Sequence, residues 1–198
     1  MSTDKKSRAR KVLLSLLTVG AIGSLAGLAV FSAFSATTTN PNNRITAGTV
    51  LLADNDSGVA MYDVSAAVPN QVVEKCIKVT YSGSLASDLK LYTGSTIGSL
   101  GSYLDLTITP GTQATSTFPD CTAFTPDVGG AIYTGTLSSF GSTHTSYAAG
   151  LVDNPGAATS WVQNDAVVYR IRLTVQDNGS AAGLTTGLHA FTWEARNQ

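Results

Sequence analysis

The chain has 198 residues, of which 43% are hydrophobic and 13% are charged, and its formal net charge is −1. The scattered lysines and arginines form no basic stripe. This excludes an ordinary nucleic-acid-binding surface, because phosphate contacts need clustered positive charges. Two histidines and two cysteines also leave little material for a metal centre or a thiol site.

The first 35 residues have the three parts of a secretory signal. Five basic residues and one acid lie in residues 1–11, no charge follows in residues 12–34, and the segment closes on small residues. We therefore predict a helical signal peptide over residues 1–35, cut between positions 33 and 36. A small-x-small rule favours cleavage after Ser35. The residues at the cut are Ala33, Phe34, Ser35 and Ala36, and the exact position stays open.

The apolar run also fits a retained transmembrane helix, because about 20 apolar residues cross a bilayer. Three features favour cleavage instead. Glycines at positions 20, 23 and 27 weaken a long helix, small residues follow, and no basic cluster comes after them. We expect export with cleavage and no stable membrane span afterwards. The first 33 residues carry a charge of +4, so the exported part carries −5 and is mildly acidic.

Cys76 and Cys121 are the two cysteines of the chain. In an exported protein an isolated pair is most simply a disulfide. Such a bond would close a loop of about 45 residues and stabilise the fold by roughly 3–4 kcal/mol. The alternative is a thiol or metal pair, for which His144 and His189 are the histidines available.

Short alternating runs of apolar and polar residues dominate the exported part, and each is typical of a half-buried strand. The clearest runs are Ala166–Val175, Val72–Tyr81, residues 103–109 and residues 189–194. We predict that Pro110 and Gly111 end the third run as a turn. Further candidate strands are residues 45–52, 59–64, 89–92 and 131–136. Long connections at residues 112–130 and 137–165 interrupt the pattern, and the second holds a predicted short helix near residues 147–151.

About eight strands separated by Gly, Pro, Asn and Ser predict an all-β fold, an antiparallel sandwich or barrel. In this interpretation residues 36–198 form a single β-sandwich domain. Residues 36–44 are a flexible N-terminal segment, since they are polar, rich in Thr and Asn, and interrupted by Pro41.

No catalytic motif is present: the sequence contains neither G-x-S-x-G nor H-E-x-x-H. His144 and His189 could meet Asp153 at a metal, but we interpret them as a loop histidine and a strand histidine. We predict no catalytic residue, no metal ligand and no cofactor.

Two further patterns have a structural interpretation. Residues 54–58 resemble a calcium loop, but the glycine comes one residue early and Ser65 replaces the bidentate Glu, which favours a tight acidic turn. An aromatic group could line a ligand site, although alternation within strands favours core packing. Its members are Tyr169, Trp161, Phe191 and Trp193.

Several segments together resemble one family of exported proteins. Residues 20–35, GAIGSLAGLAVFSAFS, resemble signal peptides cut by the SipW-type peptidase of Gram-positive bacteria. The later segments resemble the TasA and camelysin family. They are AGTVLL at 47–52, YDVS at 62–65 with Pro69, SGSL at 82–85 and FTWEA at 191–195.

The resemblance implies a jelly-roll sandwich that is secreted and retained in the extracellular matrix or at the cell surface. TasA-like members assemble into biofilm fibres, in which the N-terminus freed by cleavage is a donor strand for the next subunit. The corresponding residues here are Thr37, Thr38, Thr39, Asn40, Asn42 and Asn43. The implied partners are a SipW-type signal peptidase and further copies of this chain. Camelysin-like members are classed as cell-surface metalloendopeptidases, which is the alternative function, and no catalytic residue carries over from them.

Overall fold

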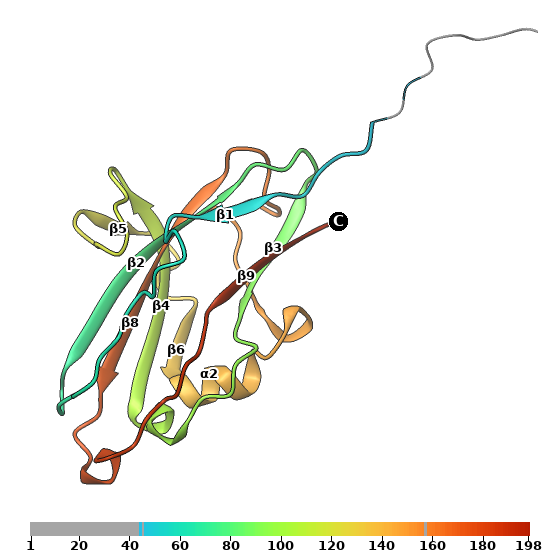
Figure 1. Cartoon of the computed structure of the whole chain (residues 1–198). Helices are drawn as coiled ribbons and strands as arrows, with labels where there is room; N and C mark the ends of the chain where they lie inside the picture. Colours follow the sequence, from blue (N-terminus) through green and yellow to red (C-terminus); the bar gives the residue numbers. More distant parts are fainter. Residues whose placement is uncertain (1–43, 45, 157) are drawn as a thin grey trace, which may run out of the picture. The chain divides into compact units, whose positions relative to one another are not determined.

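The computed structural model describes residue 44, residues 46–156 and residues 158–198 (Figure 1). The predicted signal peptide, the cleavage residues and the predicted donor residues 37–43 lie outside the described residues. The chain divides into two compact units, Met1–Thr46 and Ala47–Gln198. The second unit contains all the strands described below.

Two antiparallel sheets make up this unit, so the all-β prediction is confirmed. The larger sheet has the order β1 (Leu52–Asp54), β2 (Val72–Tyr81), β8 (Ala166–Val175), β4 (Leu104–Gln113) and β5 (Phe124–Pro126), and β6 (Tyr133–Thr136) also pairs with β4. The smaller sheet has the order β7 (Leu151–Val152), β3 (Ser87–Tyr92) and β9 (Thr192–Asn197). The described residues add one α-helix, α2 (Leu137–Thr143), and the 3-10 turns η1 (Ser99–Tyr103), η2 (Tyr147–Ala149) and η3 (Gly179–Ala181).

The central pair of strands lies where the sequence predicts it. β2 and β8 have the predicted bounds and pair from Val72↔Thr174 to Thr80↔Ala166. The alternation explains their burial: Ile171 is 1% exposed, whereas its neighbour Arg172 is exposed. Burying one apolar face of each strand stabilises the pair and fixes its register.

The predicted turn at Pro110 and Gly111 is wrong, because β4 runs through both residues to Gln113. Pro110 falls between the end of β6 and the start of β5 along the same edge of β4. The carbonyl of Pro110 accepts the N–H of Asp127 at 3.0 Å. Because the N–H and C=O of one residue point to the same side of an antiparallel strand, the N–H that proline lacks would have pointed into this gap. Gly111 fits because a Cβ there would collide with the backbone oxygen of Thr125.

Two other predicted strands are corrected by the structure. Residues 46–51 are irregular and exposed, and strand structure begins only at Leu52. The carbonyl of Thr49 instead accepts the N–H of Ser84 at 2.9 Å, and the carbonyl of Leu51 accepts the N–H of Ser82 at 2.9 Å. Both donors lie in the loop that follows β2. Residues 59–64 are also irregular, because no neighbouring strand pairs with their backbone.

The remaining predictions differ mainly in their bounds. β3 contains predicted residues 89–92 and β6 lies within 131–136. β9 starts at Thr192 instead of 189 and extends to Asn197. The short helix predicted near 147–151 is the 3-10 turn η2. α2, β7 and β5, which lies inside the connection predicted over 112–130, were not predicted. Thr136 caps α2 by accepting Ser139 N–H at 3.1 Å.

The core lies between the two sheets and α2. Its largest fully buried side chains are Trp161, Tyr81, Tyr169, Phe140, Leu89, Leu91, Leu106, Ile108, Leu137 and Ile171. Trp161 and Tyr169 therefore pack in the core, as their positions in alternating runs indicate. Phe191 and Trp193 are half-buried against the same cluster.

Candidate functional site

The predicted disulfide is present between Cys76 and Cys121, whose Cα atoms are 5.2 Å apart. It ties the β4–β5 connection to the outer edge of β2. In the same connection, the carbonyl of Pro119 accepts Cys76 N–H at 3.0 Å. Two residues further along β2, the side-chain oxygen of Asn55 accepts Lys78 N–H at 2.8 Å. This part of the edge of β2 is therefore covered.

The two histidines and Asp153 belong to separate surroundings. His144 follows α2, packs against Phe140 with ring centroids 5.0 Å apart, and its Nδ1 lies 2.7 Å from the carbonyl of Ala149. His189 precedes β9 and contacts Tyr62. Within the described residues, no three His, Cys, Asp or Glu side chains come together as they would around a metal ion.

Asp153 is a buried carboxylic acid at the end of β7. Its residue is 8% exposed, and Oδ2 has no hydrogen-bond partner among the described residues. Burial raises the pKa of this carboxyl to about 6, because water no longer solvates the charged form. Its backbone oxygen accepts the indole N–H of Trp161 at 2.7 Å, which fixes the segment against the core.

Residues 54–58 form a tight turn whose carboxylates bind backbone amides of the turn itself. Asp54 Oδ1 accepts Asp56 N–H at 3.1 Å, and Asp56 Oδ1 accepts Gly58 N–H at 2.6 Å. Gly58 has φ +76, a conformation that glycine adopts without strain. One oxygen of each carboxylate is thus used by the turn, as the interpretation of a tight acidic turn expects.

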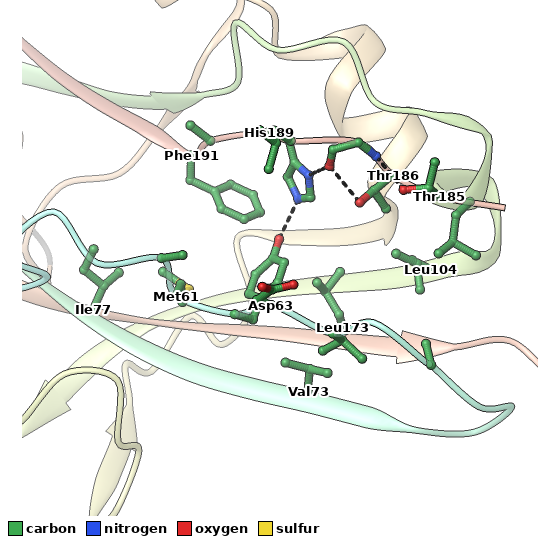
Figure 2. Close-up of a pocket in the computed structure, with 18 of the residues that line it drawn as sticks. Met61, Asp63, Val73, Ile77, Leu104, Leu173, Thr185, Thr186, His189 and Phe191 are labelled. Carbon is green, nitrogen blue, oxygen red and sulfur yellow. Dashed lines mark hydrogen bonds between the residues drawn. The ribbon is translucent and has the colours of Figure 1, made fainter.

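A feature that the sequence did not predict is an apolar groove of about 610 Å³ at one side of the sandwich (Figure 2). Its floor is the inner face of the large sheet, with Val73, Ile77 and Leu173. Its opposite wall is the segment that leads into β9, with Phe191 and then Trp193. Trp193 packs against Tyr169 across the two sheets, with ring centroids 5.3 Å apart.

An irregular segment, residues 59–67, also lines the groove, and we call it the strap. Only Met61 and Tyr62 of the strap are half-buried, and both pack against the core. The Tyr62 hydroxyl lies 2.7 Å from His189 Nε2, which joins the strap to the segment before β9 (Figure 2). Burial raises the pKa of Tyr62 above its usual range, so the hydroxyl stays protonated.

The tautomer of His189 follows from its second contact. Nδ1 lies 3.2 Å from the carbonyl oxygen of Gly187, which can only accept. In the neutral ring Nδ1 therefore carries the proton, and Nε2 accepts the hydroxyl hydrogen of Tyr62.

β9 borders the groove and is the longest edge strand within the described residues. It pairs with β3 on one side, and no described strand pairs with its other side. Gln198 N–H bonds to Ala86 in the β3 direction at 3.3 Å. Because backbone groups alternate along an antiparallel strand, the N–H and C=O groups of Trp193, Ala195 and Asn197 point away from β3.

Comparison of the sequence with protein-family models and with curated proteins found no match. None of the helices in the described part of the chain is long and apolar enough to span a membrane.

Residues 189–193 were visible in the sequence as an alternating run, so the groove wall could be found as a segment. The groove itself could not be found in this way, because it arises where this run meets the strap. Tyr62 and His189, which join the two segments, are 127 residues apart in the sequence.

Proposed function

We propose that this protein is a secreted structural subunit that assembles head to tail into extracellular fibres. The observation that carries the proposal is the six-residue edge strand β9, whose side away from β3 pairs with no described strand, beside an apolar groove between the sheets. An exposed edge accepts an extended segment through backbone hydrogen bonds, and a groove beside it accepts alternate side chains.

The donor we propose is residues 36–44 of another copy, with Thr37, Thr38, Thr39, Asn40, Asn42 and Asn43 forming the strand. Nine extended residues span about 30 Å, whereas six residues of β9 span about 20 Å. The segment is therefore long enough to follow the whole edge. Threonines favour strands because they are β-branched. Pro41 removes one donor, so pairing there is interrupted.

A donor segment and an acceptor edge that are different parts of one chain form a heterologous contact, which propagates into filaments instead of closing into a dimer. The jelly-roll topology, removal of residues 1–35 by a SipW-type peptidase, and retention in the matrix or at the cell surface belong to the same proposal. They rest on the family resemblance, and the disulfide is in line with an oxidising compartment.

The decisive experiment is electron microscopy of two purified proteins, one starting at Ala36 and one lacking residues 36–44. We expect filaments from the first protein and folded monomers from the second. Circular dichroism and size-exclusion chromatography check that the shortened protein is folded. Filaments of the same form from the shortened protein would exclude residues 36–44 as the donor.

The peptidase alternative has no support from the described residues, because no three or more His, Cys, Asp or Glu side chains come together there as they would around a metal ion. A casein-cleavage assay with and without a chelator is the matching control. Chelator-sensitive cleavage that is lost in His144→Ala or His189→Ala would favour the enzyme.

A further inference from the structure

We propose that the strap, residues 59–67, is a gate on the strand-acceptor groove and is displaced when a donor strand binds. This inference rests on the proposed function, and it adds a conformational step to that function. The free subunit would then hold its own groove partly occupied, and assembly would replace an internal contact with an intermolecular one.

The strap is bounded by a hydrogen-bonded turn at each end and has few contacts in between. At its start, Val59 N–H bonds to Asp56 at 3.0 Å; just beyond its end, Gln71 N–H bonds to Val68 at 3.1 Å. From Ala60 to Ala67, no backbone hydrogen bond to any described residue is present. Such a segment can move away from the sheet without breaking a ladder, as segments with few contacts and an exposed backbone do.

Two side chains hold the middle of the strap over the groove. Met61 and Tyr62 are half-buried, while residues 63–67 are exposed. Tyr62 contributes its ring and the hydroxyl that donates to His189 Nε2 at 2.7 Å. The free energy needed to displace the strap is therefore that of two partly buried side chains and one hydrogen bond.

The strap and a donor strand compete for the same space. The groove is lined on one wall by Phe191 and Trp193 and on the other by the strap. A strand paired with the outward backbone groups of Trp193 and Ala195 would place alternate side chains over the groove. The hydrogen bond to His189 (Figure 2) joins the strap to the segment that leads into β9, and in this proposal it breaks as the donor enters.

Met61 reports on the strap without any labelling, because it is the only methionine after residue 1. Hydrogen peroxide converts exposed methionine to the sulfoxide, and the rate follows exposure. The protein starting at Ala36 is treated with dilute peroxide as a monomer and as fibres, and Met61 oxidation is followed by mass spectrometry. We expect several-fold faster oxidation in the fibres, since the displaced strap exposes the side chain.

Tyr62→Phe tests the hydrogen bond while keeping the ring. It should raise the population of the open strap roughly fivefold, the ratio that a bond of about 1 kcal/mol gives. Met61 of the monomer should then oxidise faster, and fibres should nucleate sooner. Tyr133→Phe is the matched control: its hydroxyl donates to the carbonyl of Thr136 at 3.0 Å, within β6 and away from the strap and β9.

The outcomes separate the gate from the proposed function. Fibres in which Met61 oxidises no faster than in the monomer, with Tyr62→Phe and Tyr133→Phe behaving alike, would refute the gate and leave the fibre subunit standing. Failure of every protein to form fibres would refute both.

Discussion

A proline at position 195 should prevent a donor strand from binding β9 while the subunit stays folded. Ala195 lies within β9, opposite Leu89, and its N–H points away from β3. Proline removes that donor and places its ring where the incoming strand would run. Edge strands accept proline when the nitrogen faces outward, because no bond of the existing ladder is lost.

The size of the effect follows from the edge. Trp193, Ala195 and Asn197 provide the three outward N–H groups, and Ala195 is the central one. Losing one hydrogen bond and leaving its acceptor unpaired costs about 1–3 kcal/mol for each subunit contact. The critical concentration for fibre growth should therefore rise about 5- to 160-fold. The free energy of unfolding of the monomer should change little by comparison.

The assay is sedimentation of fibres over a series of protein concentrations, with denaturant unfolding measured in parallel. Ala195→Ser is the first control, since it keeps the N–H. Arg196→Pro is the second, because its N–H points toward β3 and its loss should destabilise the monomer itself. Equal critical concentrations for Ala195→Pro and Ala195→Ser would refute the assignment of β9 as the acceptor edge.

Two other perturbations test the unit itself. Replacing Cys76 and Cys121 with Ala should lower the free energy of unfolding by about 4 kcal/mol, because the disulfide closes a loop of 45 residues. Denaturant unfolding measures this change, and a loss below about 1 kcal/mol would contradict the loop-entropy reasoning. Asp153 has a folded-state pKa of about 6 against an ordinary value of 3.8, so the folded state binds the extra proton and stability should fall as pH rises from about 4 to 6. Asp153→Asn should remove this pH dependence and be more stable than wild type at pH 7 by about 3 kcal/mol. Thermal unfolding at pH 4 and pH 7 would detect the difference, and an unchanged pH profile would show that the carboxyl is not the group responsible.

The strands that the sequence predicts well are those whose period is fixed by burial. β2 and β8 pair with each other and bury one face each, so their alternation survives in the sequence. Pro110 misled the prediction, because a proline normally ends a strand and only the gap between β5 and β6 makes it acceptable. The strand predicted over residues 59–64 is absent for the opposite reason. This segment contains apolar residues, but no described strand lies beside it to pair with.

The groove could not be predicted because no local pattern encodes it. It depends on how the strap, the segment before β9 and the large sheet come together. Each contributes apolar side chains that do not indicate a groove when its own sequence is considered alone. The disulfide was easier, since two cysteines in an exported chain leave one pairing.

The exposed edges of β2 and β9 differ in how much of their backbone is already hydrogen-bonded. This difference sets the number of contacts that one subunit can make. On β2, the disulfide-bound loop and Asn55 use the outward amides of Cys76 and Lys78, while the outward amides of β9 have no partner among the described strands. A subunit with one donor segment and one acceptor edge has a valence of two, and bivalent units joined head to tail give unbranched polymers with two chemically different ends. Growth at the two ends would then proceed at different rates, and breaking the disulfide would raise the valence and turn linear fibres into a branched network.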